Sequence, residues 1–215
     1  MPLVTIGGDV MLRLLFVFLS FVLLGACNSG CSPSIPPQLD DDDVVDSVDD
    51  TTAPVYDPAV NWETCASGEG DHPCNIIAVD HNGDEFDLYA NYGSLVVLDL
   101  SAMWCGPCNS AGAHAQEVQD LYANDDLIYV TLLIENGHGV PPSDADIQEW
   151  ANAYGNTTSP VIPGNRSMLV SGGGTWELTS WPTFFYIDRE MVIRDIDKGY
   201  SATEVLYSIE WLLTL

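Results

Sequence analysis

Two long apolar runs stand out in the pattern of hydrophobic and polar positions along the chain. Residues 95–100 and 127–134 are apolar almost throughout, which is typical of strands buried on both faces of a sheet. The first run contains a single acidic residue, Asp99. Residues 106–123, between the runs, have the pattern of a helix, so the order strand, helix, strand predicts an α/β fold.

Two β-hairpins are predicted on either side of this central unit. Residues 76–80 and 85–88 flank an Asn-Gly dipeptide, which is a strong signal for a tight hairpin turn. Residues 184–188 and 191–196 are the expected strands of a second hairpin near the C-terminus.

Two further helices are predicted from apolar spacing and end signals. Ser143 has the position of an N-cap, and Asp146 completes a pattern like a capping box. This helix is expected to stop at Gly155, and its apolar stripe is interpreted as core packing: Ile147, Trp150, Ala151 and Tyr154. Residues 203–213 predict an amphipathic helix, with Val205, Leu206, Ile209, Leu212 and Leu213 on one face.

A run of glycines, Gly172-Gly173-Gly174, lies in the extended middle section of residues 135–180. A phosphate-binding loop would need a strand before it and a helix beginning with Lys-Ser or Lys-Thr after it, and the sequence has neither. We therefore interpret the run as a flexible connection.

The charge balance is strongly acidic. The 215 residues include five Lys and Arg against 32 Asp and Glu, and the formal net charge is −27. Such a chain has almost nothing to neutralise phosphates, so we expect no nucleic-acid partner. We interpret the excess of acid as a highly solvated surface.

The N-terminal segment predicts export. Arg13 precedes an apolar stretch at residues 14–24, which is the pattern of a signal peptide and is short for a membrane-spanning helix. The order Leu24-Gly25-Ala26-Cys27 resembles the lipobox of bacterial lipoproteins. That resemblance implies cleavage before Cys27, acylation of Cys27, and a lipid-anchored protein of the bacterial cell envelope, periplasmic or on the surface. Ordinary secretion or an uncleaved anchor are the alternatives.

We therefore divide the chain into a lipoprotein signal peptide at residues 1–26, an acidic disordered tether at 27–60, and a folded domain at 61–215. The tether contains a run of four Asp residues and little apolar surface, so folding it would not repay the lost entropy. Calcium binding by this run lacks the alternating pattern of a loop site. Asn28 lacks the familiar acidic retention signal for the inner membrane, so the outer membrane is slightly favoured.

Cys65 and Cys74 are nine residues apart in a loop rich in Gly and Asp. An exported chain meets oxidising conditions, so we expect a structural disulfide between them. A metal site that uses both cysteines and His72 is an alternative without a fourth ligand at a usual spacing. A relay pair that passes electrons to a second cysteine pair is a further alternative.

That second pair, Cys105 and Cys108, lies between the first apolar run and the helix behind it. Two cysteines separated by two residues at such a junction form a redox motif. A helix N-terminus stabilises the thiolate, which is the species that attacks a disulfide.

The segment Trp104-Cys105-Gly106-Pro107-Cys108, taken with Trp181-Pro182-Thr183, resembles the thioredoxin superfamily, most closely the membrane-anchored TlpA/ResA-type reductases. This resemblance covers residues 61–215. It implies a thioredoxin-like fold, with a central mixed sheet flanked by helices, an N-terminal hairpin extension, and an inserted helical section before the strand that follows a cis-proline.

The resemblance also implies roles for particular residues. Cys105 would be the attacking thiol, Cys108 the resolving thiol, and Pro182 the cis-proline that faces the sulfurs. Asp99 falls where thioredoxin keeps a buried acid that moves the proton of the resolving thiol, and burial in an apolar strand should raise its pKa. The expected substrate surface consists of Trp104, Gly106, Pro107, Trp181 and Thr183.

These features predict a thiol–disulfide oxidoreductase, with reduction favoured over oxidation by the Gly-Pro between the cysteines. We expect no cofactor and no metal. The expected partners are a disulfide-containing protein substrate, a membrane-linked thiol electron donor, and the membrane itself through the lipid.

Two alternatives stay open. A thiol peroxidase would need a Pro-x-x-x-Thr-x-x-Cys setting, which the residues before Cys105 do not supply. A copper-binding chaperone would use both thiols and a distal histidine, for which His138 is the loop residue to check.

Overall fold

The computed structural model describes residues 60, 62 and 64–215. The predicted lipidation site Cys27, the signal peptide predicted for residues 1–26 and almost all of the predicted tether lie outside the described residues. In the described part, none of the helices combines the length and the apolar character that crossing a membrane requires.

The predicted strands and helices all occur in the described residues, in the predicted order. The strands are β1 (Ile77–Val79), β2 (Glu85–Asp87), β3 (Leu95–Ala102), β4 (Leu127–Glu135), β5 (Val161–Pro163), β6 (Thr183–Ile187) and β7 (Ile193–Lys198). The α-helices are α1 (Gly106–Leu121), α2 (Asp144–Tyr154) and α3 (Ala202–Leu212). Short 3₁₀ turns are η1 (Tyr89–Asn91), η2 (Arg166–Met168) and η3 (Val170–Gly172).

Strand β3 lies at the centre of a five-stranded sheet, in the order β5-β4-β3-β6-β7 within the described residues. It runs parallel to β4 and antiparallel to β6, and every one of its residues is buried. β7 pairs antiparallel with β6, and β1 and β2 form a separate hairpin. The predicted mixed α/β sheet and both hairpins are confirmed.

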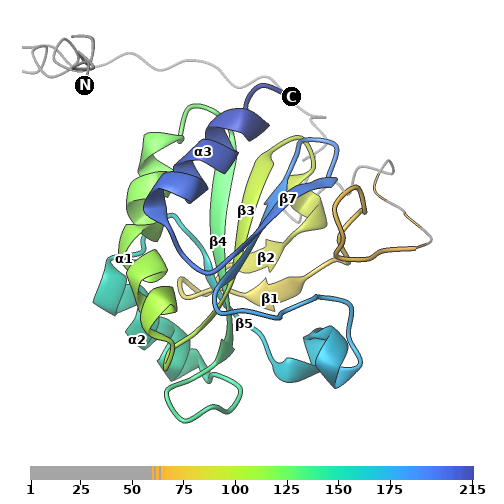
Figure 1. Ribbon diagram of the computed structural model, residues 1–215. Coiled ribbons are helices and arrows are strands. Elements are labelled where there is room, and N and C mark those ends of the chain that lie inside the picture. Colours follow the sequence, from red (N-terminus) through yellow and green to blue (C-terminus); the bar gives the residue numbers. More distant parts are fainter. Residues whose placement is uncertain (1–59, 61, 63) are drawn as a thin grey trace, which may run out of the picture. The chain divides into compact units, whose positions relative to one another are not determined.

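The two faces of the sheet are covered by different parts of the chain (Figure 1). Alternate residues of a strand point to opposite faces. Leu95 and Val97 contact residues of α1 and α3, and Leu133 of β4 contacts α2 on the same side. The other face packs against the β1–β2 hairpin and the section after β5, with Ile76, Phe86, Leu169 and Trp176 as its buried contacts.

Helix α2 begins and ends as the sequence predicts. The Ser143 hydroxyl accepts from the backbone N–H of Asp146, whose carboxylate accepts from the backbone N–H of Ser143, so a capping box is present. Gly155 ends the helix in the left-handed conformation at φ 71°, which glycine adopts without steric cost.

Both edges of the sheet are covered by loops. At the β5 edge, the backbone N–H of His81 donates to the carbonyl of Val161, and the His81 ring accepts from the Val161 N–H through Nδ1. At the β7 edge, the N–H of Gly70 donates to the Ile193 carbonyl, and the Ile193 N–H donates to the Asp71 carbonyl. These bonds satisfy backbone groups that an open edge would offer to another chain.

The middle section differs from the prediction in two places. Strand β5 is not predicted from sequence, because it has only three residues and contains Pro163, which is tolerated at a sheet edge. The interpretation of Gly172-Gly173-Gly174 as a flexible connection is wrong. A Cβ on Gly172 would lie 1.9 Å from the Arg166 carbonyl oxygen, and one on Gly174 would lie 2.2 Å from Met168, so these glycines allow two backbone segments to pack closely.

Candidate functional site

Cys105 is the N-cap of α1 and lies three residues beyond the end of β3. Its sulfur accepts a hydrogen bond of 3.2 Å from the backbone N–H of Cys108, and the two sulfurs form a disulfide in this structure. Gly106 and Pro107 occupy the first two helical positions, where proline costs no backbone hydrogen bond. The sulfur of Cys105 therefore lies at the positive end of the helix dipole, among backbone N–H groups that stabilise a thiolate.

Asn109 fixes the turn that carries the cysteines. Its side-chain amide donates to the carbonyls of Met103 and Cys105, at 3.0 and 2.6 Å. Its carbonyl oxygen accepts from the Tyr154 hydroxyl, so α2 holds the first turn of α1 in place. The sequence gives no signal for this role, because Asn109 and Tyr154 are 45 residues apart.

Two tryptophans lie beside the cysteines. The rings of Trp104 and Trp181 meet edge to face with centroids 5.4 Å apart, and Trp104 is 48% exposed. Trp181 also packs against the buried group of side chains that includes Cys105 and Cys108. The Trp181–Pro182 peptide bond is cis, and Thr183 begins β6 directly behind it. The two motif halves, 73 residues apart at Cys108 and Trp181, thus meet in the fold.

Glu135 connects Trp104 to the middle section. Its Oε2 accepts a 2.8 Å hydrogen bond from the Trp104 indole N–H, and its Oε1 pairs with the Arg166 guanidinium. The Glu135 carbonyl also accepts from the Met103 N–H at 2.9 Å. Burial acts to raise the pKa of Glu135, but the bonds from Arg166 and Trp104 outweigh it and hold the pKa below its ordinary value. The Glu135 side chain is therefore an anion that orients Trp104.

Asp99 is fully buried on the face of β3 that carries Leu95 and Val97, beneath α1. Ser101 donates to its Oδ1 at 2.6 Å, and the Tyr129 hydroxyl donates to its Oδ2 at 3.3 Å. Burial raises the pKa of Asp99 to about 7, although both hydrogen bonds act to lower it. A carboxyl group with this pKa can accept and release a proton near neutral pH.

Three further residues belong to this site and were not predicted from the sequence: Ser101, Tyr129 and Glu135. Ser101 had one usable signal, since it follows Asp99 by two positions and shares its face of the strand. Tyr129 and Glu135 lie on β4, about thirty residues further along the chain, and meet the site through strand pairing. Spacing alone does not fix that register.

Cys65 is bonded to Cys74, in the loop that covers the β7 edge. Nδ1 of His72 donates to the Met191 carbonyl at 2.8 Å, and the His72 ring stacks on Trp62 with centroids 3.8 Å apart. The disulfide uses both sulfurs that the alternative metal site would need. Across the described residues, no three His, Cys, Asp or Glu side chains come together as a metal site, and His138 is an exposed loop residue.

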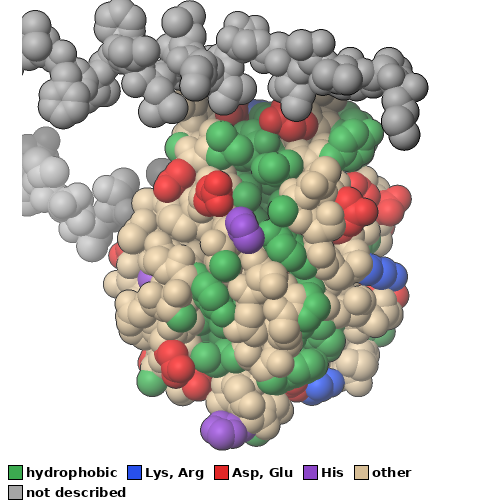
Figure 2. All heavy atoms as spheres, turned by 60° about the vertical axis from the view of Figure 1, so that its left-hand side comes forward, with side chains coloured by type: hydrophobic (Ala, Val, Ile, Leu, Met, Phe, Trp, Pro, Cys, Tyr) green, Lys and Arg blue, Asp and Glu red, His purple; other side chains and the backbone are tan. Residues whose placement is uncertain are grey.

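The face that carries the helices is short of basic groups (Figure 2). Acidic side chains lie around bands of apolar side chains on this face, with few Lys or Arg in view. Two of the described cations are also paired, Arg166 with Glu135 and Arg194 with Asp188. The surface therefore disfavours acidic partners.

No protein-family model matches the chain. Over 118 residues it is 26% identical to the thioredoxin-like protein YneN of Bacillus subtilis, a match that covers 55% of this chain and 64% of that protein. The chain spans less than two thirds of the length of the curated relatives it matches.

Solved structures give a broader likeness. The exposed lipoprotein thioredoxin of Streptococcus pneumoniae has a TM-score of 0.53 and 23% identity, over 66% of this chain and 100% of that chain. A thiol:disulfide interchange protein of the thioredoxin family from Chlorobium tepidum has a TM-score of 0.54 and 18% identity, over 71% of this chain and 99% of that chain. With the Cys-Gly-Pro-Cys turn at the start of α1 and the cis-proline before β6, these likenesses show that the chain has the thioredoxin fold.

Proposed function

We propose that the protein is a thiol–disulfide oxidoreductase that reduces disulfides of proteins or small molecules in the cell envelope. The observation that carries this proposal is the position of Cys105 at the N-terminus of α1, where its sulfur accepts the N–H of Cys108. This placement favours the thiolate form. Cys108 is the only partner within disulfide reach in the described part of the chain, and it forms that bond here.

The reaction starts from the reduced pair. The Cys105 thiolate attacks a substrate disulfide, forms a mixed disulfide, and releases the first substrate thiolate. Cys108 then passes its proton to the Asp99 carboxylate and attacks the Cys105 sulfur. The mixed disulfide breaks, the second substrate thiolate leaves and takes up a proton, and Cys105 and Cys108 are left as a disulfide. Two electrons have moved from the enzyme dithiol to the substrate.

Turnover needs a thiol donor that reduces the Cys105–Cys108 disulfide again. Because an exported protein has no access to the reducing pools of the cytosol, we propose a membrane-linked dithiol as this donor. Lipidation at Cys27 would hold the enzyme on the same membrane surface. The likeness to an exposed lipoprotein thioredoxin supports this address.

The substrate surface is proposed to consist of the Trp104 and Trp181 rings and the backbone around Pro182 and Thr183. An extended polypeptide can pair with the backbone next to such a proline while its side chains rest on the aromatic rings. The acid-rich surface favours neutral or basic segments around the substrate disulfide.

The test is reduction of the disulfides of insulin by the purified chain, with dithiothreitol as the electron source. We expect turnover by the wild type, none by Cys105→Ser, and a trapped mixed disulfide with Cys108→Ser. A wild-type rate equal to that of Cys105→Ser would reject the proposal. If the wild type is active, the mixed disulfides trapped by Cys108→Ser in the native cell would identify the substrate.

The alternatives lead to different results. A thiol peroxidase would consume peroxide rapidly in a reaction that depends on Cys105. A copper chaperone would retain one copper ion per chain and lose it in His138→Ala. Either result, together with an absence of insulin reduction, would replace the proposed function.

A further inference from the structure

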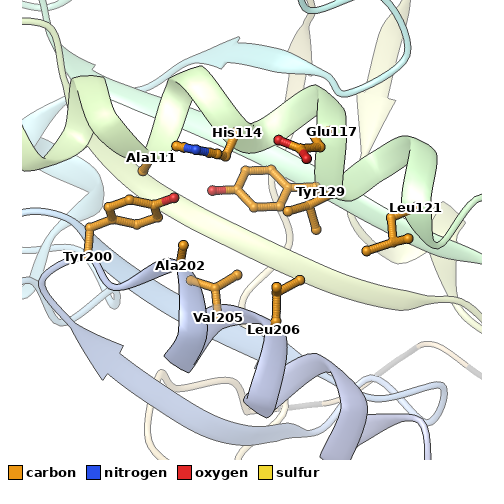
Figure 3. A pocket seen from close by; sticks show the side chains of 10 residues that line it. Ala111, His114, Glu117, Leu121, Tyr129, Tyr200, Ala202, Val205 and Leu206 are labelled. Atoms are coloured by element: carbon orange, nitrogen blue, oxygen red, sulfur yellow. The ribbon is translucent and has the colours of Figure 1, made fainter. Parts of the chain in front are cut away.

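A cavity of about 240 Å³ lies between α1 and α3 (Figure 3). Its floor is Tyr129 of β4, and its apolar wall includes Val205 and Leu206 of α3. Its polar lining includes His114 and Glu117 along α1, and Tyr200 from the loop before α3. None of these residues is used by the mechanism above.

Tyr129 connects this cavity to the buried acid. The Tyr129 side chain is 1% exposed and lines the cavity, while its hydroxyl donates to Asp99 Oδ2 at 3.3 Å. Asp99 itself has no exposed surface. A single phenol group thus separates the carboxyl from a space that is open to solvent.

Two more polar side chains, Tyr200 and His114, lie further out along the cavity. The Tyr200 hydroxyl is buried, has no hydrogen-bond partner among the described residues, and points toward the Tyr129 hydroxyl. The Tyr200 ring stacks against His114, with centroids 5.9 Å apart. Nδ1 of His114 donates to the Ser110 carbonyl at 2.8 Å, so in the neutral ring Nε2 is left as an acceptor. A buried hydroxyl of this kind is normally satisfied by a bound water.

We propose that Tyr129 is a positioning residue for Asp99, and that the cavity between α1 and α3 is the path by which the Asp99 proton exchanges with solvent. Tyr129 and Ser101 hold the two carboxylate oxygens. Water in the cavity connects Tyr129 and Tyr200 to His114 at the surface. The role of this path in turnover rests on the disulfide-reducing function proposed above.

The path matters because the substrate covers the other side of the site, around Cys105, during the reaction. While a polypeptide is bonded to Cys105, it covers the surface formed by Trp104 and Trp181. Cys108 has to lose its proton in this state. Because the pKa of Asp99 is about 7, Asp99 is protonated in part of the enzyme and cannot accept the Cys108 proton there. An outlet through the cavity under α1 allows Asp99 to lose its own proton while the substrate stays bound.

Several titratable groups lie around the path and can contribute to a pH titration of the protein. Asp99 lies at its inner end, where it is hydrogen-bonded to Tyr129. Tyr129 and Tyr200 line it, and Tyr186 of β6 acts on Tyr129 electrostatically. His114 and Glu117 lie at its mouth. Burial raises the pKa of Asp99 to about 7, whereas hydrogen bonds hold the pKa values of Glu135 and Asp146 below the ordinary range, so the titration of Asp99 is separable from theirs.

The first experiment follows the Asp99 carboxyl by ¹³C NMR titration of the oxidised protein. Tyr129→Phe keeps the ring and removes one donor to the carboxylate, so the apparent pKa of Asp99 should rise by about one pH unit. Ala202→Trp fills the cavity mouth from α3 and should raise it as well, by excluding water. Thr203→Trp is the matched control on the next, exposed position, and should leave it unchanged. An unchanged titration in Tyr129→Phe would overturn the positioning role.

The second experiment measures release of the second substrate thiol in a single turnover. With a polypeptide disulfide, Ala202→Trp should slow this step at least about fivefold relative to Thr203→Trp, which is a kinetic effect of about 1 kcal/mol. With a small disulfide that leaves the surface open, the two variants should react equally. Equal rates on both substrates would overturn the path. A lack of reductase activity would reject the proposed function. The NMR titration needs no catalysis, so it would still test the positioning role of Tyr129.

Discussion

Trp104 and Glu135 are 31 residues apart and are joined by a 2.8 Å hydrogen bond from the indole N–H to the carboxylate. The same carboxylate is 3% exposed and pairs with Arg166, whose side chain is 62% exposed. Trp104, which precedes Cys105 in the chain, is therefore oriented by a buried anion, and that anion is held by a cation from the middle section.

We expect Arg166→Gln to loosen this arrangement. Solvent screens the exposed guanidinium, so the loss of unfolding free energy should be about 1–2 kcal/mol, less than for a fully buried pair. Because Trp104 loses its fixed orientation, KM for a polypeptide substrate should rise a few-fold while kcat changes little. Urea unfolding and steady-state kinetics measure both effects.

The loss of unfolding free energy in Arg166→Gln depends on pH, and the sign of this dependence follows from the pKa of Glu135. The pKa of folded Glu135 lies below its unfolded value of 4.5, so the ion pair stabilises the fold above that pH and stops doing so as the pH falls through the folded pKa. The difference in unfolding free energy between wild type and Arg166→Gln should therefore be full at pH 7 and shrink below about pH 4.5.

Arg194→Gln is the control for the effect on KM, because it breaks a similar pair with buried Asp188 away from the cysteines. A change of KM in the control would contradict the role assigned to Trp104.

Asp99→Asn should stabilise the protein at neutral and alkaline pH. Folding raises the pKa of Asp99 from 3.8 to about 7, so ionising it in the core costs about 4 kcal/mol at pH 8. The cost is nearly absent near pH 4, grows as pH rises from about 4 to about 7, and is constant above. The stabilisation of the variant should follow the same course in denaturant unfolding at a series of pH values. A pH-independent difference between the proteins would show that Asp99 ionises normally.

The double variant Cys65→Ser, Cys74→Ser should lower the unfolding free energy by roughly 2–3 kcal/mol, since the disulfide closes a loop of about ten residues. Insulin reduction should persist, because this loop is hydrogen-bonded to Ile193 at the β7 edge, two strands away from β3, the strand that leads to Cys105. Unfolding and insulin reduction are both measured, under conditions that keep Cys105 and Cys108 functional, so that the stability and the activity of the variant can be compared. A loss of activity without a loss of stability would support the alternative in which Cys65 and Cys74 relay electrons.

Gly112→Ala should destabilise the protein, although alanine favours a helix by about 1 kcal/mol. The added Cβ would lie 2.6 Å from the buried Trp150 ring and 2.9 Å from Tyr154, so α1 and α2 would have to separate. We expect a net loss of about 1–3 kcal/mol in thermal or urea unfolding. Trp150→Leu should recover part of the loss in the double variant by making room. Additive effects of the two substitutions would disprove the contact.

Much of the fold was predictable because each local pattern agrees with the final structure. The apolar run that became β3 is buried on both faces, as a central strand must be. The capping box at Ser143 and the glycine at position 155 give the limits of α2. β5 and the close packing at Gly172 and Gly174 were not predictable, because both depend on backbone contacts with residues outside their own segments.

The sequence by itself determined that Cys105 and Cys108 lie between a strand and a helix, since short-range periodicity and spacing decide this. It also placed Asp99 inside an apolar strand. Only the tertiary structure brought Glu135 to Trp104 and Tyr129 to Asp99, because strand register sets which side chains of β3 and β4 become neighbours. Burial then made Asp99 a group that titrates near pH 7, and burial is a property of the assembled fold.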